Sequence, residues 1–263
     1  MVMITVIATI TILIACTIGA IVGFGGGVII KPVLDSMGFA TIDVVNFISS
    51  CAVLAMSISS IIRHRIAKTR VDKKIVLCVA VGAVVGGFCG NSLFSLLLNA
   101  AGNSVTKAIQ AIMIIIVVAF AVFYVNQKNP FTLNIKNPAA MVGAGLLLGT
   151  LNSFFGIGGG PINITVLLLM FSLAVKDGAV YSLAIVFFCQ TSNLITLFAK
   201  NQFAPYADYL PLILCAIVAA VAGGLLGSTL NKKFSDKTVK IIFTAVMLVV
   251  FGINIYNAIT GLK

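Results

Sequence analysis

The chain has 263 residues, of which 60% are hydrophobic and only 9% are charged. A soluble domain of this size cannot bury so much apolar surface, so we expect the lipid bilayer to be the solvent. The formal net charge of +11 does not indicate a nucleic-acid partner, because the basic residues gather between apolar segments and no soluble domain accompanies them.

Apolar segments of about the length that crosses a bilayer follow one another along almost the whole chain. They are 2–22, 44–62, 75–98, 105–125, 139–155, 178–199, 209–230 and 239–258. A β-barrel is excluded, because its strands alternate apolar and polar residues and these segments do not. The sequence therefore predicts an all-α polytopic membrane protein.

The first segment has a feature of a cleaved leader, since residues 13–16 read LIAC, like a lipoprotein cleavage site. A signal peptide needs a positive residue before its apolar stretch, and none is present here. The internal repeat described below also needs this segment as a helix. We therefore expect it to belong to the folded protein.

Two clusters of glycine interrupt the apolar sequence. The first is Gly23-Phe24-Gly25-Gly26-Gly27, and the second, 133 positions further on, is Gly156-Ile157-Gly158-Gly159-Gly160. Glycine permits the φ values of a turn and the close approach of another backbone or a ligand. Non-helical backbone inside a membrane is tolerated only where protein buries it or where it lines a polar cavity. We predict a helical hairpin in 2–37 and another in 139–175, each turning at its glycine cluster.

The spacing of the glycine clusters recurs elsewhere and indicates a duplicated unit. Lys107 matches Lys240 at the same offset of 133, and residues 48–49 match residues 181–182. We predict a first repeat at 1–126 and a second at 137–263, joined by the polar linker 127–136.

Two basic loops, 63–74 and 232–240, indicate how the repeats are oriented. Their basic residues are Arg63, Arg65, Lys68, Arg70, Lys73 and Lys74 in the first loop, and Lys232, Lys233, Lys237 and Lys240 in the second. One loop precedes and the other follows the third apolar segment of its repeat, whereas loops 99–106 and 200–208 carry no net charge. Because basic loops face the cytoplasm, the halves must have opposite orientations in the cell membrane. We predict inverted repeats, each a glycine-broken hairpin followed by three transmembrane helices.

Each predicted break presents unpaired backbone N–H groups and the positive end of a helix dipole. Two such ends related by the inverted symmetry can hold an anion near the midplane, with about half a positive charge each. The residues assigned to this substrate site are Gly23, Phe24, Gly25, Gly26, Gly27, Asn152, Gly156, Gly158, Gly159, Gly160, Pro161, Asn163 and Gln190. The alternative role of the glycines is tight helix packing, but two contiguous clusters flanked by polar residues favour a site.

Charged side chains have little part in this prediction. Lys31 lies one helical turn beyond the first cluster, and we expect it to snorkel to the interface. The six aspartates lie at or beyond segment ends, so no carboxylate relay inside the membrane is expected. The six cysteines lie in apolar segments without metal-ligand spacing, and His64, the single histidine, belongs to a basic loop. We expect no enzyme, no cofactor and no metal site.

The second cluster in its context, from Phe155 to Asn163, resembles the signature of the sulfite exporter TauE/SafE family, with a degenerate copy at 23–27. The resemblance covers essentially the whole chain. It implies a secondary transporter for sulfite, sulfoacetate or another organosulfonate. The first copy departs from the pattern, because Lys31 stands where the second copy has Ile164. An anion channel that uses the same helix ends stays open as the alternative. As partners we expect a small anion and the lipid bilayer, and we leave a homodimer open.

Overall fold

The computed structural model describes residues 2–69, 71–157, 159–199 and 204–261. Gly158 of the predicted site, Arg70 of the first basic loop and part of the neutral loop 200–208 lie outside the described residues. The described part contains helices and no strand. The elements are α1 Val2–Val22, α2 Gly27–Met37, α3 Ile42–Ile66, α4 Lys73–Asn126, α5 Pro138–Phe155, α6 Pro161–Phe171, α7 Val175–Ala199, η1 Ala204–Tyr209, α8 Leu210–Lys233 and α9 Asp236–Gly261.

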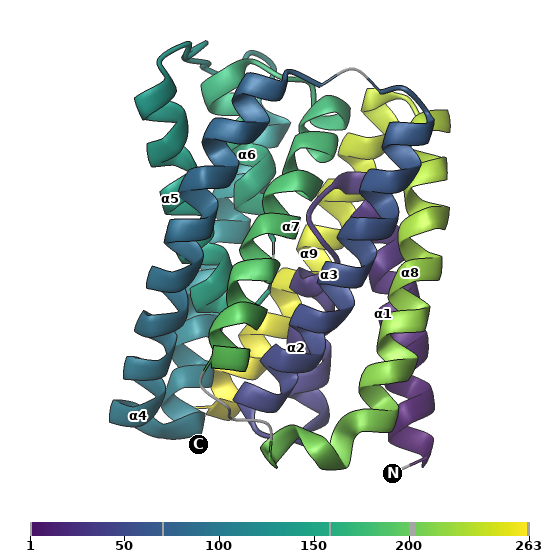
Figure 1. Ribbon diagram of the computed structural model, residues 1–263, viewed down its shortest axis with the longest axis vertical. Coiled ribbons are helices and arrows are strands. Elements are labelled where there is room, and N and C mark those ends of the chain that lie inside the picture. Colours follow the sequence, from purple (N-terminus) through teal and green to yellow (C-terminus); the bar gives the residue numbers. More distant parts are fainter. Residues whose placement is uncertain (1, 70, 158, 200–203, 262–263) are drawn as a thin grey trace.

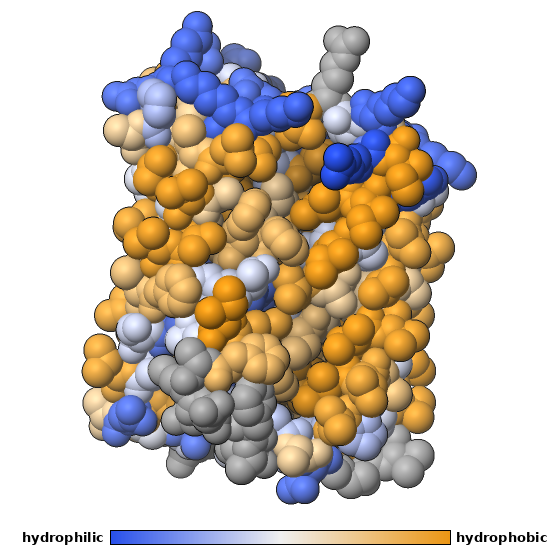
Figure 2. Space-filling view, viewed as in Figure 1, coloured by the Kyte–Doolittle hydropathy of each residue, from blue (hydrophilic) through white to orange (hydrophobic). Residues whose placement is uncertain are grey.

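The surface of this helical bundle is apolar over most of its height. Seven of the described helices are long and apolar enough to cross a membrane. Figure 2 shows a broad hydrophobic band between two hydrophilic ends, and the upper end is the more densely hydrophilic. Large apolar side chains are exposed on this surface, among them Met3, Leu96, Phe123 and Val218. In water such a surface would cause aggregation. The predicted polytopic α-helical membrane fold is confirmed.

Helix α4 is two membrane helices joined at a glycine. Its 54 residues would extend about 80 Å at 1.5 Å per residue, far more than the hydrocarbon core of about 30 Å. Gly102 has φ 74° and ψ 179° inside this helix, so the chain turns there, and Figure 1 shows the two arms reaching the same end of the bundle. The predicted segments 75–98 and 105–125 are these two arms.

The chain leaves helical geometry at both glycine clusters. Between α1 and α2, Gly23, Gly25 and Gly26 have φ values of 89°, 87° and 68°. Between α5 and α6, Gly156 and Gly159 have φ values of 64° and 151°. Residues with a Cβ rarely adopt such values. The helices therefore stop where the sequence predicts that they stop.

The hairpin α1–α2 opens at one end of the bundle and the hairpin α5–α6 at the other. The start of α1 and the residues after α2 line one hollow together with Tyr209, whose hydroxyl donates to the carbonyl of Phe39. The linker before α5 donates instead to the end of α6, from Leu133 N to Leu169 O at 2.7 Å. In Figure 1 the first of these ends is at the bottom and the second at the top.

The two basic loops lie at the same end of the molecule, at the top in Figure 1. Lys232 Nζ donates to the carbonyl of Ala67 at 3.1 Å, and Arg63 Nε donates to the hydroxyl of Thr229 at 2.9 Å. Lys176, which follows α6, donates to the carbonyl of Phe234 at 2.7 Å. The basic loops therefore share an end with the opening of the α5–α6 hairpin.

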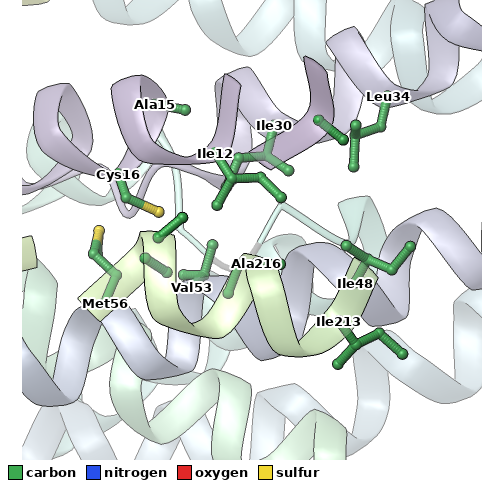
Figure 3. Close-up of a cluster of buried hydrophobic side chains, with 14 of the residues drawn as sticks. Ile12, Ala15, Cys16, Ile30, Leu34, Ile48, Val53, Met56, Ile213 and Ala216 are labelled. Atoms are coloured by element: carbon green, nitrogen blue, oxygen red, sulfur yellow. The ribbon is translucent and has the colours of Figure 1, made fainter. Parts of the chain in front are cut away.

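A cluster of small and branched apolar side chains packs around the first break. Figure 3 shows Ile12 of α1, Ile30 of α2, Ile48 of α3 and Ile213 of α8 pointing into one interior. Helix α8 approaches α1 closely, because a Cβ at Gly227 would collide with the carbonyl of Thr17. Small residues allow such contacts between membrane helices, so this cluster fixes the first hairpin against α3 and α8.

Candidate substrate-binding site

The two glycine clusters lie directly against each other. A Cβ at Gly27, which begins α2, would collide with the carbonyl of Ile157 in the second cluster. In the reverse direction, a Cβ at Gly159 would lie 3.0 Å from the carbonyl oxygen of Phe24 and would collide with Val186. Only glycine allows these backbones to approach so closely. The helix breaks of the two halves therefore meet at one place inside the bundle.

Not every assigned residue of the first cluster faces a polar space. A side chain at Gly23 would collide with Ala179 of α7. The ring of Phe24 is fully buried and contacts Phe243 of α9, with 6.5 Å between ring centroids. These two residues hold the break in place by packing.

A small polar cavity lies beside the second break. Its volume is about 40 Å³. Of the assigned residues that the structure describes, only Gly156 lines it. The other lining residues come mainly from α3, α4 and α7: Asp43, Asn46, Phe47, Ser50, Asn91, Phe94, Ser153, Asn193, Leu197 and Tyr206.

Neutral amides of α5, α6 and α7 form two buried pairs, and Asn193 of one pair lines the cavity. Asn152 Nδ2 donates to Asn163 Oδ1 at 2.8 Å, and Asn193 Nδ2 donates to Gln190 Oε1 at 2.7 Å. The other amide nitrogens, Asn163 Nδ2 and Gln190 Nε2, are buried without a hydrogen-bond partner among the described residues. A buried unpaired donor costs about 1–3 kcal/mol, so an acceptor that reached both groups would be bound favourably.

Lys31 does not snorkel, and the prediction that it would is wrong. The side chain is only 1% exposed, because α2 packs against α1, α3 and α9 and lies inside the bundle. Its ammonium donates to Asn46 Oδ1 at 2.7 Å and to Gln110 Oε1 at 2.8 Å. It also lies 3.5 Å from the carboxylate of Asp35. These partners offset the cost of burying the charge.

Asp35 lies in the last turn of α2, at a segment end as the sequence indicates, but it is buried, with only 9% of its surface exposed. Asp35 lies one turn after Lys31 on α2. Helix α4 holds it there, because Lys107 Nζ donates to the backbone carbonyl of Asp35 at 2.7 Å.

His64 likewise differs from a solvated loop residue. It is buried, and its Nδ1 lies 3.3 Å from the hydroxyl of Thr69.

Comparison with known proteins agrees with this architecture. The family model of the sulfite exporter TauE/SafE matches residues 8–254. The chain belongs to the sulfite exporter TauE/SafE family. It is therefore a multi-pass transporter of the plasma membrane and not an enzyme.

Two curated relatives align with this TauE/SafE member over most of its length. The probable membrane transporter protein YunE of Bacillus subtilis is 26% identical, over 94% of this chain and 96% of that protein. The probable membrane transporter protein MJ0441 of Methanocaldococcus jannaschii is 24% identical, over 88% of this chain and 87% of that protein. No solved structure gives a significant match.

Sequence reasoning missed several residues that surround the breaks of this TauE/SafE member. Asn46 and Asn91 line the cavity, and Gln110 accepts from Lys31 while its amide nitrogen donates to the carbonyl of Phe154 beside the second break. Each is a single amide inside an apolar segment. An unpaired amide is costly inside an apolar segment, so such an amide is expected to have a polar partner. The position of these three amides in the sequence therefore indicated that they lie near other polar groups.

Proposed function

We propose that this TauE/SafE member is a secondary transporter that moves a small sulfur-containing anion, such as sulfite, sulfoacetate or another organosulfonate. The anion binds where the two glycine breaks meet. The observation that carries the proposal is the direct contact of the breaks, with Gly27 against Ile157 and Gly159 against Phe24. This contact brings the N-terminal ends of α2 and α6 toward one place, and helix N-terminal ends favour anions.

Donors from side chains complete the proposed site. Asn163 lies in the first turn of α6, and Gln190 lies in α7. Their unpaired amide nitrogens match the acceptor oxygens of a sulfonate or sulfite group. The cavity beside the second break is small, about 40 Å³, and we expect its walls to separate when the anion passes. A site that opens and closes in this way supports alternating access.

The fold is proposed to consist of two inverted repeats, 1–126 and 137–263, joined by the linker 127–136. Equivalent residues make equivalent contacts, which supports this division. A Cβ at Gly23 would meet Ala179, and a Cβ at Gly156 would meet Asn46. Residues 23 and 156 are 133 positions apart, and so are residues 46 and 179. The hairpins also open at opposite ends of the bundle.

Both basic loops are proposed to face the cytoplasm, because they share one end of the molecule and basic loops stay on that side. The test uses single cysteines in a cysteine-depleted chain and an impermeant thiol reagent on intact cells. Asn103→Cys should react from outside, whereas Lys73→Cys and Lys233→Cys should react only after the membrane is opened. Labelling of Asn103→Cys and Lys233→Cys from the same side would contradict the proposed orientation.

Counterflow in proteoliposomes tests the transport activity. Vesicles loaded with unlabelled methanesulfonate should accumulate labelled methanesulfonate transiently, because a carrier exchanges its substrate across the membrane. Sulfite should compete, while chloride should compete weakly. Ionic currents at rates far above those of a carrier, without counterflow, would instead establish an anion channel.

A further inference from the structure

A buried ion pair lies one side chain away from the polar cavity. The Lys31 ammonium lies 3.5 Å from the Asp35 carboxylate, and both residues belong to α2. The same ammonium donates to Asn46 Oδ1 at 2.7 Å, and Asn46 lines the cavity. A charge on Lys31 can therefore act either on Asp35 or, across Asn46, on an anion in the cavity.

Asp35 also reaches water. Together with Lys107, Asp208 and Tyr209 it lines an open hollow of about 640 Å³. This hollow lies at the end where the α1–α2 hairpin opens, beside Phe39 and Ala40. The ion pair thus separates a water-accessible hollow from the polar cavity, and protons can reach the carboxylate from the hollow.

Few other charges of the described residues face this pair. Lys107 of α4 contacts the backbone of Asp35, Asp208 of η1 lies across the hollow, and Asp43 of α3 lines the cavity. Helix α1 has no charged residue, and the described charges of α9 lie in its first two turns, near the basic loops. From α9 the contact is neutral, because Asn257 Nδ2 donates to the carbonyl of Pro32 at 2.9 Å.

Charge balance limits what this arrangement can do when an anion enters. Lys31 and Asp35 together are neutral, so while they are paired they add no net positive charge to the partial charges of the two helix ends when an anion enters. Uncompensated buried charges are strongly disfavoured. The open hollow offers a proton to Asp35, and protonation of that carboxylate leaves the Lys31 charge free for the anion.

We propose that Asp35 is the proton-coupling group of the transporter, so that one proton moves with each monovalent anion. This inference rests on the proposed function. In the binding step, Asp35 takes up a proton on its carboxylate oxygen, and the Lys31 ammonium shifts from Asp35 to the anion. In the release step on the other side, the anion leaves, the proton leaves Asp35, and the Lys31–Asp35 pair forms again. No covalent bond other than the O–H bond forms or breaks.

Proteoliposomes that contain a trapped pH indicator test the coupling. Methanesulfonate is the probe, because it remains a monoanion throughout the neutral range and carries no proton of its own. With the membrane potential clamped at zero by potassium and valinomycin, addition of external methanesulfonate should acidify the lumen of wild-type vesicles. The ratio of protons to labelled anions taken up should be one to one.

Asp35→Asn is the decisive variant, because a carboxamide resembles the protonated acid and cannot release a proton. It should lose lumen acidification but still exchange methanesulfonate in counterflow, and its half-saturating concentration should fall, since no carboxylate competes for Lys31. Asp35→Glu should acidify the lumen like the wild type. Asp208→Asn, which alters another carboxylate of the same hollow, should do so as well.

The outcomes separate the two proposals. If Asp35→Asn vesicles acidify at the wild-type ratio of protons to anions, the coupling role of Asp35 is overturned and the proposed transport function stands. The same conclusion follows if the Asp35→Asn protein is folded but has lost counterflow. Absence of counterflow in the wild type, with methanesulfonate and with sulfite, would overturn the proposed function and the coupling together. Acidification that is lost equally in Asp208→Asn would show that Asp35 has no special role.

Discussion

The two helix breaks share a backbone design and differ in chemistry. After the first break comes a buried lysine, Lys31, paired with Asp35, while Ile164 stands at the equivalent position of the second half. The second break is flanked by a hydrogen-bonded pair of amides, Asn152 and Asn163. The positions that match this pair in the first half hold Gly19 and Ile30.

In the proposed pair of inverted repeats, this difference means that the two half-sites are not copies of each other. The first half contributes charge and the second half contributes neutral hydrogen-bond donors, and the breaks bring the two together. An anion needs both a compensating charge and donors for its oxygens. In the proposed site each half is therefore incomplete without the other, and substitutions in the two halves should have different effects.

The largest effect is expected where the breaks touch. Gly27→Val and Gly159→Val should abolish counterflow, because a Cβ at Gly27 collides with the carbonyl of Ile157, and a Cβ at Gly159 collides with Val186 and crowds the carbonyl of Phe24. Gly160→Ala should retain most activity, since Gly160 has an extended φ of −162° and a Cβ there meets only Ile157 Cδ1 at 3.1 Å. Gly143→Ala, with open space around it, is the matched control. Equal losses in all four variants at equal membrane insertion would contradict a special role for the contact.

The fold was predictable because its signals are local. Long apolar segments specify the spanning helices, and two glycine clusters specify the breaks. The partners of Lys31 were not predictable in this way. Its burial depends on Gln110, which lies 79 positions away, and on Asn46, which lies 15 positions away. Nothing near Lys31 in the sequence distinguishes a lysine that snorkels from one that meets two amides, because the difference arises from the packing of α2 within the bundle.

The next largest effect concerns the charge in the first half. Lys31→Met should destabilise the protein by about 3–5 kcal/mol, because it leaves Asp35 buried and unpaired. The double variant Lys31→Met/Asp35→Asn should recover most of that stability without recovering methanesulfonate binding. Thermal unfolding in detergent and equilibrium binding measure the two properties separately. If the double variant binds methanesulfonate like the wild type, Lys31 does not serve the anion.

A smaller effect is expected from the neutral donors of the second half. Asn163→Ala and Gln190→Ala should each weaken methanesulfonate binding by about 1–3 kcal/mol. Each change also removes the acceptor of another buried amide, Asn152 Nδ2 or Asn193 Nδ2, so the unfolding temperature should fall as well, and binding is measured at a temperature where both variants are folded. Asn126→Ala, which removes an exposed amide bonded to Thr244, is the control and should bind normally. Unchanged affinity in Asn163→Ala and Gln190→Ala would exclude these amides from the site.

Protection of two cysteines by substrate tests most directly whether both halves form one anion site. Ser50 of the first half and Ser153 of the second both line the cavity, and Ser→Cys changes the size of each little. In a cysteine-depleted chain, methanesulfonate should slow the reaction of Ser50→Cys and of Ser153→Cys with a small thiol reagent to the same extent. It should leave Ser235→Cys, in a basic loop, unaffected. Protection of only one cavity position, or of neither while transport persists, would contradict a site shared by the two halves.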